Sequence, residues 1–168
     1  MAALGHIGVG LAAKRVAPEV PIGAMLLAVE ASDILWGVFA LTGIDKPSGA
    51  FPNPGPAPWS HGLFMSVVWS VLAGLLAARI YRRNRTGVVI GGLVFSHWVL
   101  DFITHPMWPN RVPDLPLLFK GSPMVGLGLY SSTAVSLVID FGLVLLGAAI
   151  YVHGNAANRR LSRQSTNS

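Results

Sequence analysis

The sequence predicts an all-α fold, a polytopic membrane helix bundle with four transmembrane helices and a short apolar helix at the N-terminus. Hydrophobic residues make up 52% of the chain and charged residues only 11%, whereas soluble domains carry about 25% charged residues. Four apolar runs are long enough to cross a bilayer, which takes about 20 helical residues. We expect one membrane-embedded domain over residues 1–153 and a disordered basic cytoplasmic tail over residues 154–168.

The first apolar segment, residues 1–13, is too short to span a membrane alone. It contains three glycines that we expect to allow close packing against another helix: Gly5, Gly8 and Gly10. Residues 21–43 form the first full span, which opens with a proline and closes with a glycine, as helices often do.

The stretch over residues 44–60 is too proline-rich for a helix, and we expect it to form an external loop. Residues 61–81 form the second span and residues 86–108 the third. A second loop, residues 110–128, is rich in proline and glycine. Its apolar patch at residues 115–119 either lies on the membrane surface or covers a site.

The fourth span covers residues 129–152. The distribution of basic residues along the chain predicts how the four spans are oriented in the membrane. Nine of the twelve Lys and Arg residues fall on one side of the four-span arrangement, which the positive-inside rule assigns to the cytoplasm. We therefore expect a multi-pass protein of the cytoplasmic (inner) membrane with both termini in the cytoplasm. Three basic residues lie on the opposite side: Lys46, Arg111 and Lys120.

The most informative stretch lies in the third span, where His97, Asp101 and His105 are spaced four residues apart. On a helix this spacing places the three side chains on one face. Ionisable groups inside a membrane are costly unless they are paired or bind an ion, so they mark a functional site. We expect His97 and Asp101 to be the catalytic centre of this site.

Other ionisable residues lie at compatible depths. With a rise of about 1.5 Å per helical residue, Asp33, His97 and Asp140 all fall near the middle of the membrane. His6 reaches a similar level if its segment enters as a half helix. His61 can join Asp101 only if its helix starts deeper or its loop dips inward. We further expect residues beside the ligands to orient them, and the candidates are His105, Asp140 and Glu30.

Imidazole nitrogens and carboxylate oxygens are typical ligands of divalent metal ions, and the chain has no cysteine that could bind metal instead. We expect a divalent cation, zinc in the first place, with manganese or iron as alternatives. The expected ligands are His6, Asp33, His61, His97 and Asp101. No serine or cysteine faces a histidine in the arrangement of a covalent hydrolase, so metal-assisted hydrolysis is the best chemical match.

Four motifs resemble those of a known family: Gly5-His6, Ser32-Asp33-Ile34, Trp59-Ser60-His61 and Ser96-His97-Trp98-Val99-Leu100-Asp101. In them the chain resembles the bacterial family of predicted inner-membrane metal-dependent hydrolases. The order His, Asp, His, His-x-x-x-Asp is also similar to the ligand order of bacterial zinc-dependent phospholipase C. The resemblance covers roughly residues 1–110. It implies that Asp33, His61 and His97 hold one ion, that Asp101 bridges, and that His6 helps to bind a second.

The chain departs from the family in two places. The usual Pro-Asp-Ile-Asp is here Ala31-Ser32-Asp33-Ile34, and the basic-Gly stretch before the second histidine is Ala57-Pro58-Trp59.

We expect a membrane-bound hydrolase of a phosphoester or phospholipid, with membrane lipids and a small-molecule or lipid substrate as partners and no nucleic acid. The alternatives are a small permease or ion carrier that uses the same residues, and a metal-stabilised scaffold without catalysis.

Overall fold

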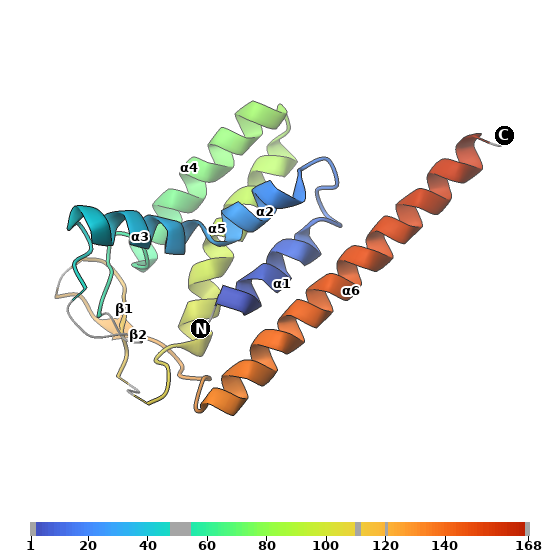
Figure 1. Ribbon diagram of the computed structural model, residues 1–168. Coiled ribbons are helices and arrows are strands. Elements are labelled where there is room, and N and C mark those ends of the chain that lie inside the picture. Colours follow the sequence, from blue (N-terminus) through green and yellow to red (C-terminus); the bar gives the residue numbers. More distant parts are fainter. Residues whose placement is uncertain (1–2, 48–54, 110–111, 120, 167–168) are drawn as a thin grey trace.

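The computed structural model describes residues 3–47, 55–109, 112–119 and 121–166, and it is mostly helical (Figure 1). Two strands of two residues each, β1 (Leu115–Pro116) and β2 (Met124–Val125), pair antiparallel. The helices, in chain order, are α1 (Ala3–Ala13), α2 (Ile22–Val29), α3 (Ala31–Thr42), α4 (Leu63–Tyr81), α5 (Asn84–Thr104) and α6 (Thr133–Thr166).

Three helices in the described part of the chain are long and apolar enough to cross a membrane: α4, α5 and residues 133–154 of α6. The pair α2 and α3 passes the same test together but is bent by 57°, so it is a broken span or a re-entrant loop. The structure therefore bears out a helical membrane protein with three spans, or four if the bent pair counts as one.

The single helix predicted over residues 21–43 is broken at Glu30, which ends α2 and precedes α3. No proline or glycine marks the break. Asp33 lies in the first turn of α3, where the positive end of the helix dipole favours a carboxylate. The break also leaves the last carbonyls of α2 without helical partners, and one of them contacts the candidate site.

Two further boundaries differ from the prediction. Helix α5 ends at Thr104 rather than residue 108, because a residue before proline is disfavoured in a helix and His105 is extended with ψ 152°. Helix α6 continues to Thr166, where the sequence predicted disorder (Figure 1). The alanines, arginines and leucine after residue 154 have high helix propensity, which favours this continuation.

Helix α5 lies at the centre of the bundle, in contact with α1, α2, α3 and α4, while α1 packs along α6 (Figure 1). Half of the apolar stretch of α5 is buried, against 17% for α4 and for α6. The core between these helices is formed by Ala17, Val20, Met25, Ala28, Val29, Ala77, Ile90, Leu93 and Val94. The outer faces of α4 and α6 therefore present apolar side chains, as lipid-facing helices do.

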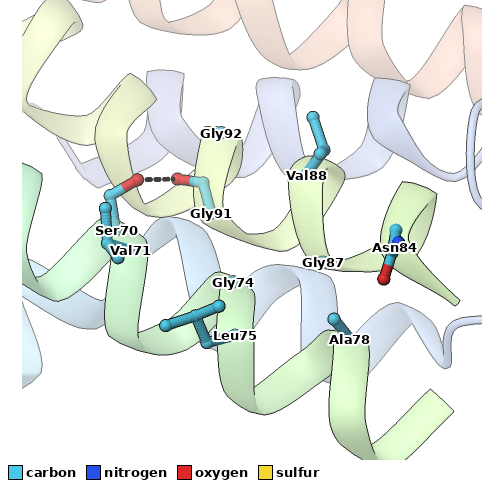
Figure 2. Close-up of a pocket in the computed structure, with 10 residues that line it drawn as sticks. All are labelled: Ser70, Val71, Gly74, Leu75, Ala78, Asn84, Gly87, Val88, Gly91 and Gly92. Carbon is cyan, nitrogen blue, oxygen red and sulfur yellow. Dashed lines mark hydrogen bonds between the residues drawn. The ribbon is translucent and has the colours of Figure 1, made fainter. Parts of the chain in front are cut away.

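Small residues bring the helix backbones close together. Figure 2 shows the crossing of α4 and α5, where Ser70 donates a hydrogen bond of 2.6 Å to the carbonyl of Gly91. A Cβ atom on Gly87 would lie 2.6 Å from the carbonyl oxygen of Gly74. On the other side of the bundle, a Cβ atom on Gly8 would lie 2.3 Å from the carbonyl oxygen of Leu143 in α6. The predicted close packing of the N-terminal glycines is thus confirmed for Gly8.

The loop before α6 caps the end of α5. The amides of residues 127–130 donate hydrogen bonds of 2.6–3.2 Å to the carbonyls of residues 102–105. Gly126 has φ +154°, and a Cβ atom there would lie 2.3 Å from the carbonyl oxygen of His105. The four hydrogen bonds satisfy carbonyls that a helix end leaves free, and they fix the backbone of His105 beside the candidate site.

Candidate metal centre

The bundle brings all five predicted ligands into one cluster, together with Glu30. His6 comes from α1, Asp33 from the first turn of α3, and His61 from the turn before α4. Helix α5 supplies His97 and Asp101 from one face, as their spacing predicted. Of the two conditions stated for His61, the inward-dipping loop is the one observed: α4 begins only at Leu63, and the turn before it brings His61 to Asp33 and Asp101.

Four of these side chains form a ring of alternating imidazoles and carboxylates. Asp33 Oδ1 lies 3.1 Å from His61 Nε2 and 3.6 Å from His97 Nε2. Asp101 Oδ2 lies 3.7 Å from His61 Nε2 and 3.4 Å from His97 Nε2. Ligand atoms around a tetrahedral zinc ion, with bonds of about 2.0–2.1 Å, are about 3.3–3.4 Å apart. The four neighbouring separations bracket this value. The ligand atoms that all lie within 4.8 Å of one another form two groups that share His97: one is His61, His97 and Asp101, and the other is His6, Glu30, Asp33 and His97.

His97 is oriented by the break between α2 and α3. Its Nδ1–H donates a hydrogen bond of 2.7 Å to the carbonyl of Val29, the last residue of α2. The other nitrogen, Nε2, faces the carboxylates and has no hydrogen-bond partner within the described part of the chain. A histidine that binds a metal through one nitrogen commonly donates the other to a carbonyl, and His97 is held in this way.

His61 is oriented by a short relay. Its Nδ1–H donates to Ser60 Oγ at 2.9 Å, and the Ser60 hydroxyl donates to Asp45 Oδ2 at 2.8 Å. Asp45 also accepts the backbone amides of Trp59 and Ser60. Both Ser60 and Asp45 are buried. The relay fixes the ring so that Nε2 points at the two carboxylates of the cluster.

The other oxygen of Asp101 faces His6, with Oδ1 lying 3.5 Å from His6 Nε2. The rings of His6 and His97 are stacked with their centroids 3.9 Å apart. His6 is only 2% exposed, and its Nδ1 has no hydrogen-bond partner among the residues that the structure describes. Asp101 thus faces imidazoles with both of its oxygens: Oδ1 lies near His6, and Oδ2 lies near His61 and His97.

His105 lies at the outer edge of the cluster. Its Nε2 is 3.9 Å from Asp101 Oδ1, and its Nδ1–H donates to both oxygens of Asp114 at 3.0 and 3.1 Å. Burial opposes the charged imidazolium, but the bonds to Asp114 and the charge of Asp101 raise the pKa of His105 above its ordinary value. Asp114 comes from the predicted covering loop, whose Leu117 carbonyl accepts the amide of Phe64. That loop therefore closes over the outer end of the cluster.

Among the described residues Asp140 forms no hydrogen bond or ion pair with a histidine, whereas the sequence predicted that it orients one. Its Oδ1 accepts the backbone amide of Gly5 at 3.2 Å and the hydroxyl of Tyr130. Gly5 lies in the first turn of α1, where amides lack helical partners. Asp140 therefore anchors the start of α1, directly beside His6. Burial of Tyr130 and its hydrogen bond to Asp140 raise the pKa of the Tyr130 hydroxyl.

The cluster is accessible to solvent at Asp33. The Asp33 side chain is 45% exposed, whereas those of His97 and Asp101 are almost fully buried. Near the His61 relay lies an apolar cavity of 820 Å³ lined by residues that include Asp45, Lys46, Trp59 and Phe119. The Trp59 and Phe119 rings pack with centroids 5.0 Å apart.

Asp45 and Asp114 are the two residues of the site that sequence reasoning missed. Each lies in a proline-rich loop, outside any helical period that would relate it to the cluster. The sequence offered one indication of their role. The chain has only seven acidic residues, and an acidic residue in an apolar loop requires a partner.

Comparison with protein-family models, with curated proteins and with solved structures found no match for this chain.

Proposed function

We propose that this protein is a membrane-embedded, metal-dependent hydrolase of a phosphoester, with a phospholipid as the favoured substrate. One observation carries the proposal. His61 and His97 each donate Nδ1–H to an acceptor and turn Nε2 toward two carboxylates. A neutral imidazole would place a lone pair there, against negative charge. A cation between these atoms removes that conflict without leaving isolated charges buried.

The residues fit a divalent cation. Asp33, His61, His97 and Asp101 offer two nitrogens and two oxygens, a set suited to zinc, with manganese or iron as alternatives. A cation held there supplies Lewis acidity, since it lowers the pKa of a bound water and polarises a phosphoryl oxygen. This chemistry matches the hydrolase family that the sequence motifs resemble.

The surrounding residues position the ligands and admit substrate. The contacts with Val29 and Ser60 keep both imidazoles in the ligating tautomer. The loop that carries Asp114 limits water entry, while the exposed side of Asp33 leaves an approach. His105 presents Nε2 beside Asp101, where it can hold a proton or hydrogen-bond a phosphoryl oxygen. The apolar cavity near Lys46 suits an acyl chain and an anionic head group.

We also propose the orientation that the basic residues predict. The bent pair α2 and α3 then counts as the fourth span, the basic ends face the cytoplasm, and the protein resides in the inner membrane. In this orientation the proline-rich loops and the cavity lie on the extracytoplasmic side. The approach to Asp33 would then open toward the outer leaflet.

A second candidate function is a small ion carrier, and the broken span favours it. Carriers often bind ions where a membrane helix is interrupted, and here α2 and α3 break beside Glu30 and Asp33. Uptake of zinc or manganese into proteoliposomes would support the carrier. Hydrolysis without uptake would support the enzyme.

The test of the hydrolase uses detergent-purified protein, a chromogenic phosphodiester and phospholipid vesicles. We expect hydrolysis that stops with a chelator and returns on reloading with zinc or manganese. Asp101→Asn should lower the rate by at least about 100-fold, because it removes a charged ligand from the ring. Glu19→Gln, at an acid outside the cluster, is the control and should leave the rate unchanged. Full activity in Asp101→Asn would contradict the proposal.

A further inference from the structure

Glu30 occupies the break between α2 and α3 and is not needed for the ring of four ligands. Its backbone, with φ −93° and ψ 6°, ends one helix and precedes the next. One carboxylate oxygen, Oε1, is buried and has no hydrogen-bond partner in the part of the chain that the structure describes. Burying a carboxylate oxygen without a partner costs free energy, and a cation bound to Glu30 would remove this cost.

Glu30 is not isolated. Ligand atoms of His6, Glu30, Asp33 and His97 all lie within 4.8 Å of one another. His6 is nearly fully buried and, among the described residues, its Nδ1 also lacks a hydrogen-bond partner. Glu30 and His6 thus each have a buried polar atom without a hydrogen-bond partner among the described residues, and each offers a ligand atom to the same group.

The first ion cannot bind both the Glu30 carboxylate and the His6 imidazole. An ion bound by His61, His97 and Asp101 takes its ligands from a group of atoms that includes neither Glu30 nor His6. His97 has only one nitrogen available, because its Nδ1–H is committed to the carbonyl of Val29. Glu30 and His6 are therefore left over, next to Asp33, whose carboxylate has two oxygens and can bridge two ions.

Charge leads to the same conclusion. Three carboxylates, Glu30, Asp33 and Asp101, meet in the cluster, and ligating histidines are neutral. One divalent ion leaves a net charge of about −1 in a largely buried site, which would repel a phosphoester. A second divalent ion changes the net charge to about +1, which suits an anionic substrate.

We propose that Glu30 and His6 bind a second divalent cation, with the Asp33 carboxylate shared between the two ions. The inference rests on the proposed function for its first ion. Two ions that share a carboxylate stabilise both the attacking and the leaving oxygen of a phosphoester, so the pair is suited to phosphoester hydrolysis.

The test loads the full-length protein in detergent with manganese, then measures manganese per chain and the electron paramagnetic resonance spectrum. We expect two manganese ions per wild-type chain and a spectrum of two magnetically coupled ions. Glu30→Gln should keep one ion and give the spectrum of a single ion, and Glu30→Asp should retain the second ion with lower affinity. Glu19→Gln is the control and should match the wild type.

The failures of the two proposals are distinguishable. One uncoupled ion in both the wild type and Glu30→Gln would overturn the second site and leave the first intact. No manganese or zinc in the wild type would overturn both. If Glu30→Gln fails to fold by circular dichroism, His6→Gln provides the same comparison, since it alters a ligand of the second ion alone.

Discussion

A metal ligand is effective only if its imidazole is held in one orientation, and Ser60 does this for His61. The Ser60 hydroxyl accepts from His61 Nδ1–H and donates to the buried Asp45. Neither residue supplies a ligand atom to the ring of four ligands. Their effect is to keep the Nε2 lone pair of His61 directed at the ion position.

Ser60→Ala should therefore weaken metal binding by about 10- to 100-fold without removing a ligand, since groups that orient ligands contribute this much. Competition with a chelating dye measures the affinity. Ser131→Ala, at a serine outside the cluster, should bind metal as the wild type does. Equal affinity in Ser60→Ala and the wild type would show that the relay does not orient His61.

At the scale of the element, α1 carries His6 to the site and depends on very close packing against α6. A Cβ atom on Gly8 would meet the backbone of Leu143 at 2.3 Å, and one on Gly147 would meet the backbone of Gly8 at 2.0 Å. Backbone atoms cannot move aside as a flexible side chain can. Any side chain at these positions therefore separates the two helices.

Gly8→Ala should lower the stability of the protein by about 1–3 kcal/mol, the usual cost of overpacking, and weaken metal binding by displacing His6. Thermal unfolding followed by circular dichroism measures the first effect. Gly23→Ala in α2 is the matched control, because no atom lies within 4 Å of its Cβ position. Alanine there should be neutral or slightly stabilising. A Gly8→Ala variant as stable as Gly23→Ala would contradict the packing.

The sequence predicted the helices better than their interruptions. Hydropathy located α4 to within two residues at its start, because one apolar run is bounded by a proline-rich loop and by arginines. It missed the break at Glu30, since that residue lies within a continuous apolar pattern and the break depends on tertiary contacts such as His97 with Val29. His97 and Asp101 were predictable from local spacing. Asp45 and Asp114 reach the site only through loop folding.

For the whole molecule, the exposed apolar faces of α4 and α6 and the central position of α5 describe a bundle built for lipid surroundings. Large apolar side chains on these faces are well exposed, among them Leu75 at 64%, Ile80 at 65% and Val138 at 74%. In water such surfaces would aggregate, whereas in a bilayer they contact lipid tails. The site then lies inside the membrane domain, beneath the loop that carries Asp114.

The proposed orientation predicts opposite accessibility for the two ends of the bundle. Because the chain has no cysteine, single cysteines can be introduced as reporters. Leu118→Cys, in an exposed loop position, should react with a membrane-impermeant maleimide in intact bacterial cells. Asn84→Cys, at the first residue of α5, should react only after permeabilisation. The reverse pattern would invert the topology.

The central claim is that the cluster of His6, Asp33, His61, His97 and Asp101 binds a divalent metal. Elemental mass spectrometry of the detergent-purified protein, beside His97→Ala and Asp101→Ala, tests it most directly. We expect about one or two zinc, manganese or iron ions per wild-type chain and loss of the ion that the ring holds in both variants, since each variant removes one of its ligands. A wild-type protein that holds none of these metals, even after reloading, would contradict it.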